Sequence, residues 1–176
     1  LGPLDPSPDL SDSMAMMRDW VRMRTTAIPR SIRFGFVDVR DVAAVGVGSL
    51  SRGGAPARHL LAGHIHSMAD MLGMAAELTG RRVRVMGSPL WTITLGGMVC
   101  DLVGRATGNK MPLTGETARL TVGNARAGGL QSVDQGSAAE AFDFPSRSVT
   151  ETLADTINWM HTAGHLTADQ AGVLAT

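Results

Sequence analysis

The stretch IRFGFVDVRDVAAVGVGSL, residues 32–50, changes periodicity in its middle and constrains the fold more than any other part of the chain. Around Phe34 and Phe36 the apolar side chains alternate, which is typical of a half-buried strand. From Asp41 onward the apolar positions follow helical spacing. The sequence therefore predicts a strand that leads directly into a helix, with Asp41 as the cap of that helix and Asp38 in the corner before it.

Several other segments carry recognisable start and stop signals. Ser67 followed by Asp70 predicts a capping box at the start of a helix, and so does Ser148 followed by Glu151. The patterns predict helices from Ser11 or Ser13 to Val21 and over residues 66–80, 89–104, 113–124 and 148–164. They predict strands over residues 58–63 and 81–87, and an extended piece with one or two helical turns over residues 132–144. A loop is expected over residues 25–31, and turns are expected over residues 51–56 and 128–129.

Three short strands alternating with about six helices indicate an α/β fold. The 176 residues are enough for one domain with its own core, and no second domain is visible. Three strands make a small sheet for so many helices, so we expect part of the sheet to lie outside this sequence. The chain opens with LGPLDPSP and lacks a first methionine, as a segment cut from a longer protein would.

Composition excludes several classes of protein. Sixteen basic and sixteen acidic residues cancel, so the positive charge typical of a nucleic-acid-binding protein is missing. The single cysteine, Cys100, excludes an internal disulfide framework and favours a reducing, cytoplasmic compartment. Residues 89–104 are apolar but short for a bilayer span, and Asp101 interrupts them. They predict a buried or surface-docked helix, with membrane contact as the lesser alternative.

The sequence offers few candidates for a metal site, a nucleophile or a nucleotide-binding turn. His64 and His66 are two residues apart and His161 and His165 four apart, but no third ligand has suitable spacing. We therefore expect ordinary histidines and no metal. Cys100 lies among apolar neighbours, which favours an inert thiol. The 21 glycines form no G-x-G-x-x-G turn, so no dinucleotide grip is expected in this chain.

The order of four segments resembles one family. LGP, FGFVDVRDVAAVGVGSL, RHLLAGHIHSMADMLGMAAELTGRR and SVDQGSAAEAFDFPSRSVTETLADTINWM follow one another as in the carboxy-terminal half of extended short-chain dehydrogenases/reductases. This is the NAD-dependent epimerase/dehydratase group, and the dihydroflavonol-reductase-like branch is the most similar. The resemblance covers nearly all of the chain and implies the carboxy-terminal portion of a Rossmann-like fold.

In that family the amino-terminal half carries the NAD(P) turn and a catalytic Tyr-x-x-x-Lys. This chain has no tyrosine, and its only lysine, Lys110, has no partner four residues earlier. The resemblance thus implies no catalytic residue here, and NAD or NADP bound only in the complete protein. It implies that Leu1, Gly2 and Pro3 border the cofactor, that Leu4, Met14, Met17, Arg33 and Phe34 line the substrate cleft, and that Phe36, Asp38 and Asp41 form a structural corner.

Some positions depart from the family pattern. Nucleotide-sugar epimerases have a phosphate-binding arginine where this chain has Phe34, with Arg33 beside it. This favours a small apolar carbonyl substrate over a nucleotide sugar. Ser137 replaces a lysine of the family, and Asp143 replaces a glycine, a change that a left-handed turn can tolerate.

Two functions from different classes remain open at this stage. The first is the substrate-binding part of an NAD(P)-dependent oxidoreductase, a carbonyl or aldehyde reductase or an epimerase/dehydratase relative, inactive without its amino-terminal half. The second is a catalytically dead binding or interaction module derived from this fold. A membrane-associated steroid or lipid dehydrogenase is a further alternative that rests on residues 89–104. The resemblance also allows a homodimer of the full-length protein.

Overall fold

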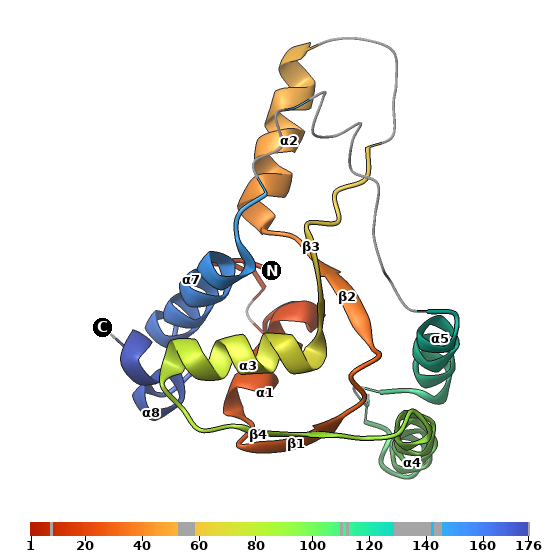
Figure 1. The fold of residues 1–176 in the computed structure, drawn as a ribbon. Coiled ribbons are helices and arrows are strands. Elements are labelled where there is room, and N and C mark those ends of the chain that lie inside the picture. Colours follow the sequence, from red (N-terminus) through yellow and green to blue (C-terminus); the bar gives the residue numbers. More distant parts are fainter. Residues whose placement is uncertain are drawn as a thin grey trace.

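The computed structural model describes residues 1–7, 9–52, 59–109, 111, 113–128, 142 and 146–175. Within them the chain forms four short strands, seven α-helices and one 3-10 turn, which is a mixed α/β fold (Figure 1). In chain order the elements are α1 (Asp12–Arg22), β1 (Thr25–Ile28), β2 (Arg33–Phe36), α2 (Val39–Arg52), β3 (His64–Ser67), α3 (Met68–Thr79), β4 (Arg84–Gly87), α4 (Trp91–Thr107), α5 (Gly115–Arg126), α7 (Val149–Thr162), α8 (Ala168–Ala171) and η1 (Gly172–Leu174).

The described strands form two separate two-stranded sheets. β1 and β4 are parallel, with Thr25 opposite Arg84, whereas β2 and β3 are antiparallel, with Phe36 opposite His64. The prediction of a loop over residues 25–31 is wrong, because β1 occupies its first half. The partner of β1 is distant in sequence, and Pro29 directly after the strand resembles a loop signal.

A second strand lies later in the chain than predicted. The segment 59–63 is not extended in a sheet, and β3 begins only at His64. Gly63 has a φ of +59°, and a side chain there would overlap the carbonyl oxygen of Phe36. This left-handed conformation interrupts the extended backbone just before β3 and explains the shift.

The main core is formed by α1, α3, α7, α8 and η1, which lie together in Figure 1. The predicted caps of α3 are confirmed. The Ser67 hydroxyl accepts from the Asp70 nitrogen at 3.1 Å, the Asp70 carboxylate accepts from the Ser67 nitrogen, and Gly80 has a φ of +66°. The fully buried side chains of this core include Met17, Met71, Leu72, Leu153, Ile157 and Met160.

Helices α1 and α7 also follow the sequence prediction, with one correction. Ser11 precedes α1, and the apolar side chains that recur at helical spacing in both helices are buried. The Ser148 hydroxyl caps α7 by accepting from the Glu151 nitrogen at 3.2 Å. The predicted reciprocal half of this capping box does not form, because the Glu151 carboxylate lies 3.6 Å from the Arg147 guanidinium instead.

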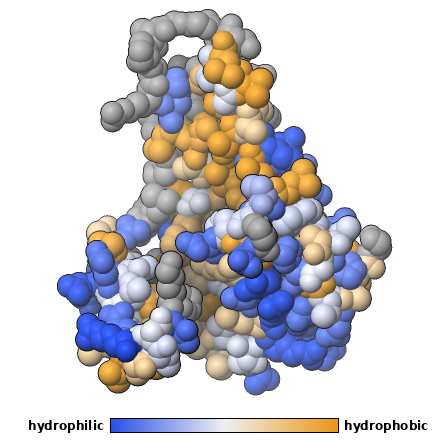
Figure 2. Space-filling view, turned by 180° about the vertical axis from the view of Figure 1, so that it is seen from behind, coloured by the Kyte–Doolittle hydropathy of each residue, from blue (hydrophilic) through white to orange (hydrophobic). Residues whose placement is uncertain are grey.

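Two helices leave apolar faces exposed. α2 rises away from the core (Figure 1), and Figure 2 shows a large hydrophobic area over this part of the molecule. Its exposed apolar side chains are Val39, Val42, Val47 and Leu50. α4 packs on α5 at one edge of the molecule, and only its Gly97 is buried. The prediction of a buried α4 is therefore wrong, and the surface-docked alternative describes it.

Several sequence predictions concern residues outside those described. They include most of the segment 132–144, most of the turn over 51–56, and the positions of Lys110, Ser137 and Asp143. Helix α2 continues as far as Arg52, so the first two residues of the predicted turn are helical.

No helix in the described part of the chain combines the length and the apolarity that a bilayer span requires.

Candidate functional site

Asp38 occupies the corner between β2 and α2. Its Oδ1 accepts from the Arg40 backbone nitrogen at 2.8 Å, which caps the first turn of α2. Its carboxylate also accepts from Nε and Nη2 of Arg40 at 2.9 and 2.7 Å and from the Thr152 hydroxyl of α7 at 2.7 Å. Arg40 extends further to Asp155 at 2.6 Å. The corner is thus fixed to α7 by charge-assisted hydrogen bonds.

These contacts determine the ionisation of Asp38. Burial of the carboxyl opposes its ionisation, but the hydrogen bonds from Arg40 and Thr152 outweigh burial and hold the pKa of Asp38 well below its usual range. The hydrogen bond to Asp38 raises the pKa of Arg40 in turn. Asp38 is therefore a permanently charged structural group and not a proton-transfer group at neutral pH.

Asp41 does not cap α2, which corrects the prediction from the sequence. The helix begins at Val39, before its apolar periodicity becomes visible, so Asp41 already lies within the first turn. Its buried carboxylate accepts from the Arg147 backbone nitrogen at 2.8 Å and pairs with the Arg147 guanidinium. Asp38 and Asp41 together hold the start of α7 against the start of α2.

The segment Leu1–Pro3 lies beside this corner. The Leu1 nitrogen donates to the Val37 carbonyl at 2.9 Å, and the Val39 nitrogen donates to the Leu1 carbonyl at 2.7 Å, which is the hydrogen-bond pattern of parallel strands. Gly2 has a φ of +148°, and a side chain there would overlap Val39. That these residues border a cofactor stays a prediction.

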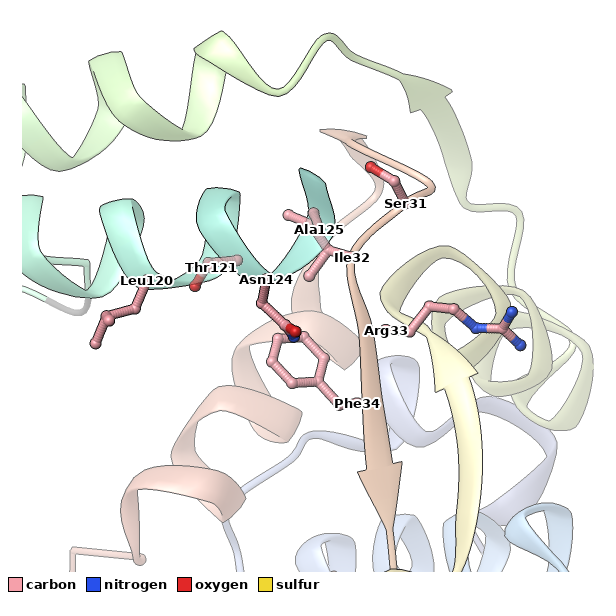
Figure 3. A pocket seen from close by; sticks show the side chains of 8 residues that line it. All are labelled: Ser31, Ile32, Arg33, Phe34, Leu120, Thr121, Asn124 and Ala125. Atoms are coloured by element: carbon pink, nitrogen blue, oxygen red, sulfur yellow. The ribbon is translucent and has the colours of Figure 1, made fainter. Parts of the chain in front are cut away.

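A small pocket of about 250 Å³ opens between the start of β2 and α5 (Figure 3). The side chains of Ile32 and Phe34 point toward α5, and Asn124 of α5 points toward the Phe34 ring (Figure 3). The pocket is lined by Ser31, Ile32, Arg33, Phe34, Leu120, Thr121, Asn124 and Ala125. It combines apolar walls with hydroxyl and amide groups, which is the composition of a ligand-binding site.

Arg33 and Phe34 were expected to contact the same ligand, but their side chains leave β2 on opposite faces (Figure 3). This follows from the alternation of side chains along a strand. The Arg33 guanidinium points away from α5, toward a wider depression that Arg30, Ser67 and Asp70 also line. Among the described residues, the buried Nε of Arg33 has no hydrogen-bond partner. Phe34 therefore belongs to the pocket, and the charge of Arg33 does not.

The other predicted substrate residues lie outside the pocket. Met14 and Met17 are only 4% and 1% exposed and pack in the core, so neither side chain offers surface to a ligand. This corrects the expectation that they line the cleft. Leu4 is exposed, with a φ of +68°, near the beginning of the chain.

Two histidines that were considered as ligands, His64 and His161, have ordinary hydrogen-bond partners. His64 Nε2 lies 3.0 Å from both the Ser146 hydroxyl and the Arg147 carbonyl, and His161 Nδ1 lies 3.2 Å from the Leu166 carbonyl. In the described ranges, no three His, Cys, Asp or Glu side chains lie together as a metal site would require. Cys100 is half-buried on α4.

Sequence reasoning missed the α5 wall of the pocket. Leu120, Thr121 and Asn124 belong to a segment predicted only as a helix, with no motif that marks a binding site. A weak signal exists, because Leu120 and Asn124, four residues apart, fall on the face of the helix opposite its buried residues Ala118 and Val122.

Comparisons with known proteins place the fold but not the function. The chain matches no family model, and no curated protein matches it. Among solved structures, the crystal structure of gox2253 is similar, with a TM-score of 0.64 and 19% sequence identity over 95% of this chain and 48% of that one. The chain thus spans about half the length of gox2253. The likeness is one of fold.

Proposed function

We propose that this chain is the substrate-binding part of an NAD(P)-dependent oxidoreductase, a carbonyl or aldehyde reductase or an epimerase/dehydratase relative. It corresponds to the carboxy-terminal portion of a Rossmann-like extended short-chain dehydrogenase and works together with a nucleotide-binding part. The order of the segments in the sequence supports this assignment. The succession of β2, the Asp38 corner, α2 and β3 is consistent with it.

The observation that carries the proposal is the composition of the pocket. Its lining offers hydroxyl and amide groups, but within the described residues it contains no carboxylate, imidazole, thiol or phenol. Such a site can bind and orient a ligand, but it cannot exchange a proton with a carbonyl oxygen near neutral pH. The nucleotide-binding part therefore has to supply the general acid and the hydride donor.

The exposed face of α2 supports the need for this second part. Val47 and Leu50 are more than half exposed on a helix that begins at a rigid, buried corner. Contiguous exposed apolar surface usually marks an interaction site. That the chain spans about half the length of gox2253 is consistent with a fold of this kind joined to about as many further residues.

The pocket walls favour a small apolar carbonyl substrate. Ile32, Phe34 and Leu120 provide apolar surface, and the Asn124 amide can donate to a carbonyl oxygen. The Thr121 hydroxyl donates to the Thr117 carbonyl at 2.8 Å and can only accept from a ligand. The guanidinium of Arg33, which borders the pocket, points away from α5 (Figure 3), so among the described lining residues no charged group faces the pocket to bind a phosphate. A hydrophobic aldehyde or ketone fits this combination.

The test compares the 176-residue chain with the complete product of its gene. We expect no binding of NADH or NADPH by the chain alone in calorimetry, and reduction of hydrophobic aldehydes by the complete product. In the latter, Asn124→Leu should raise KM roughly twofold to tenfold, because one hydrogen bond is lost, while the Kd of NAD(P)H stays unchanged. The matched control, Asn158→Leu, replaces an exposed asparagine on α7 and should change neither constant.

Two results would contradict the proposal. Micromolar binding of NADPH by the 176-residue chain would mean that it has its own nucleotide site. A complete product that binds ligands in the pocket but no nicotinamide cofactor would instead be a binding module.

A further inference from the structure

The face of α4 that points away from α5 is apolar and exposed. Side chains along it recur at intervals of three and four residues and therefore lie on one side of the helix. Five of them are between 50% and 69% exposed, over a helix roughly 26 Å long. This surface is called the α4 stripe and consists of Trp91, Leu95, Met98, Val99, Leu102 and Val103.

The opposite face of α4 is occupied by α5. A side-chain carbon on the buried Gly97 would lie 2.7 Å from the Ala118 Cβ, so the two helices are in close contact there. Both carboxylate oxygens of Asp101 accept from the Gly115 nitrogen at 3.1 Å. Asp101 is the only charged residue between Trp91 and Gly104. The Asp101 carboxylate is thus bound to the start of α5, and the α4 stripe contains no charged residue.

The stretch of sequence that contains the stripe is mainly basic. Residues 81–126 contain seven basic and two acidic residues, whereas the whole chain has sixteen of each. One of the two acids is Asp101, which is bound to α5. The exposed arginines of this segment are Arg82, Arg84, Arg105, Arg119 and Arg126. An apolar helical face with a tryptophan at one end, within a basic segment, has the chemistry that binds an anionic lipid surface.

A second copy of the chain fits this surface less well. Pairing two α4 stripes would bring two basic segments together, and like charges across an interface disfavour association. A position across the bilayer does not fit α4 either, because the helix is not long and apolar enough to span a membrane. An in-plane position at the head-group level satisfies both the apolar side chains and the arginines.

We propose that the α4 stripe docks this protein on the surface of an anionic lipid bilayer, with α4 lying in the plane of the membrane and α5 above it. The inference does not depend on the oxidoreductase proposal, since the stripe and the pocket involve different faces of the α4–α5 pair. From the sequence alone, membrane contact of residues 89–104 was the lesser alternative to a buried or surface-docked helix. The exposed α4 stripe makes membrane contact the favoured one.

The test uses the 176-residue chain and vesicles of phosphatidylcholine alone or with 30% phosphatidylglycerol, in a flotation assay. We expect binding to the anionic vesicles that weakens as salt rises. Leu95→Glu combined with Leu102→Glu should lower the partition coefficient roughly tenfold or more, because two apolar side chains are removed from the lipid. The matched control, Val47→Glu with Leu50→Glu on α2, makes the same charge change at exposed apolar positions and should bind as the parent does.

Trp91 supplies a second readout, because Trp20 is buried and Trp159 is half-buried in the core region. Its fluorescence should shift to the blue with anionic vesicles, and Trp91→Phe should abolish the shift. Absence of flotation overturns the proposal, and so does flotation that the α4 variant leaves intact or the α2 control removes. A dimer in sedimentation velocity that the α4 variant dissociates, without vesicle binding, would assign the stripe to contacts between copies.

Discussion

Replacement of Asp38 tests whether the corner between β2 and α2 is held by its carboxylate. The side chain is completely buried, caps α2, and accepts hydrogen bonds from Arg40 and from the Thr152 hydroxyl. Asp38→Ala removes all of these at once. Asp38→Asn keeps one oxygen, which can accept from the Arg40 nitrogen at the cap, and replaces the oxygen that faces Thr152 by an NH2 group that can donate to the Thr152 hydroxyl. It also removes the negative charge.

The magnitude follows from what each variant leaves unpaired. Breaking a buried ion pair costs about 3–5 kcal/mol of the free energy of unfolding. Arg40 is one-third exposed and can rehydrate, so the lower end applies, and we expect a loss of about 3 kcal/mol for Asp38→Ala. Asp38→Asn should lose about 1–2 kcal/mol, because a charge-assisted hydrogen bond becomes a neutral one. Asp19→Ala, at the exposed pair with Arg18, should change the free energy by less than about 0.5 kcal/mol.

The assay is equilibrium urea unfolding at pH 7, 5 and 3. The pKa of Asp38 in the folded protein lies below its value of about 3.9 in the unfolded chain. The unfolded state therefore binds more protons, and the contribution of Asp38 is present above about pH 4 and decreases as the pH falls below it. The difference between the parent and Asp38→Ala should thus be constant between pH 7 and 5 and smaller at pH 3.

Two outcomes would refute this reasoning. A loss below about 1 kcal/mol for Asp38→Ala at pH 7 would mean that the corner does not depend on the carboxylate. A difference that grows as the pH falls would mean that the folded protein raises the pKa of Asp38 instead of lowering it.

Two further pairs of variants test packing, again by urea unfolding. Leu153→Ala, at a fully buried position of α7, should lower the free energy of unfolding by about 2–5 kcal/mol. Leu50→Ala, at an exposed position of α2, should change it little, and equal effects would contradict the assignment of the core. Gly97→Ala should lose about 1–3 kcal/mol, because its new carbon would lie 2.7 Å from the Ala118 Cβ. Gly123→Ala, with open space around it, should instead gain about 0.5–1 kcal/mol, and a gain at both positions would refute close contact between α4 and α5.

The sequence predicted elements whose signals are local. The α3 helix has its cap at Ser67, its apolar stripe and its terminal Gly80 within fifteen residues, and all three are confirmed. The strand over residues 33–36 was likewise found, because alternation is visible in a short window. These elements depend on neighbours in sequence, so no tertiary information was needed.

Features that depend on distant partners were missed or misplaced. β1 forms because β4 pairs with it, and nothing within residues 25–28 reveals that partner. Asp41 was predicted as the cap because α2 begins two residues before its apolar periodicity becomes visible. The partners Arg147 and Thr152 are more than a hundred residues away from Asp41 and Asp38 and leave no local signal. Phe34, which the resemblance implied for the substrate cleft, lines the pocket, whereas nothing in the sequence singled out Asn124 on α5. That this pocket holds a substrate stays a prediction.

The bonds of the Asp38 corner have a consequence for the order of folding. Asp41 binds Arg147, 106 residues later, and Asp38 binds Thr152, 114 residues later. Contacts of such large sequence separation form slowly, because a long loop has to close before they can contribute. During synthesis on a ribosome, the base of α2 would thus remain without its partners until α7 emerges, and we expect this corner to be among the last parts of the molecule to become rigid.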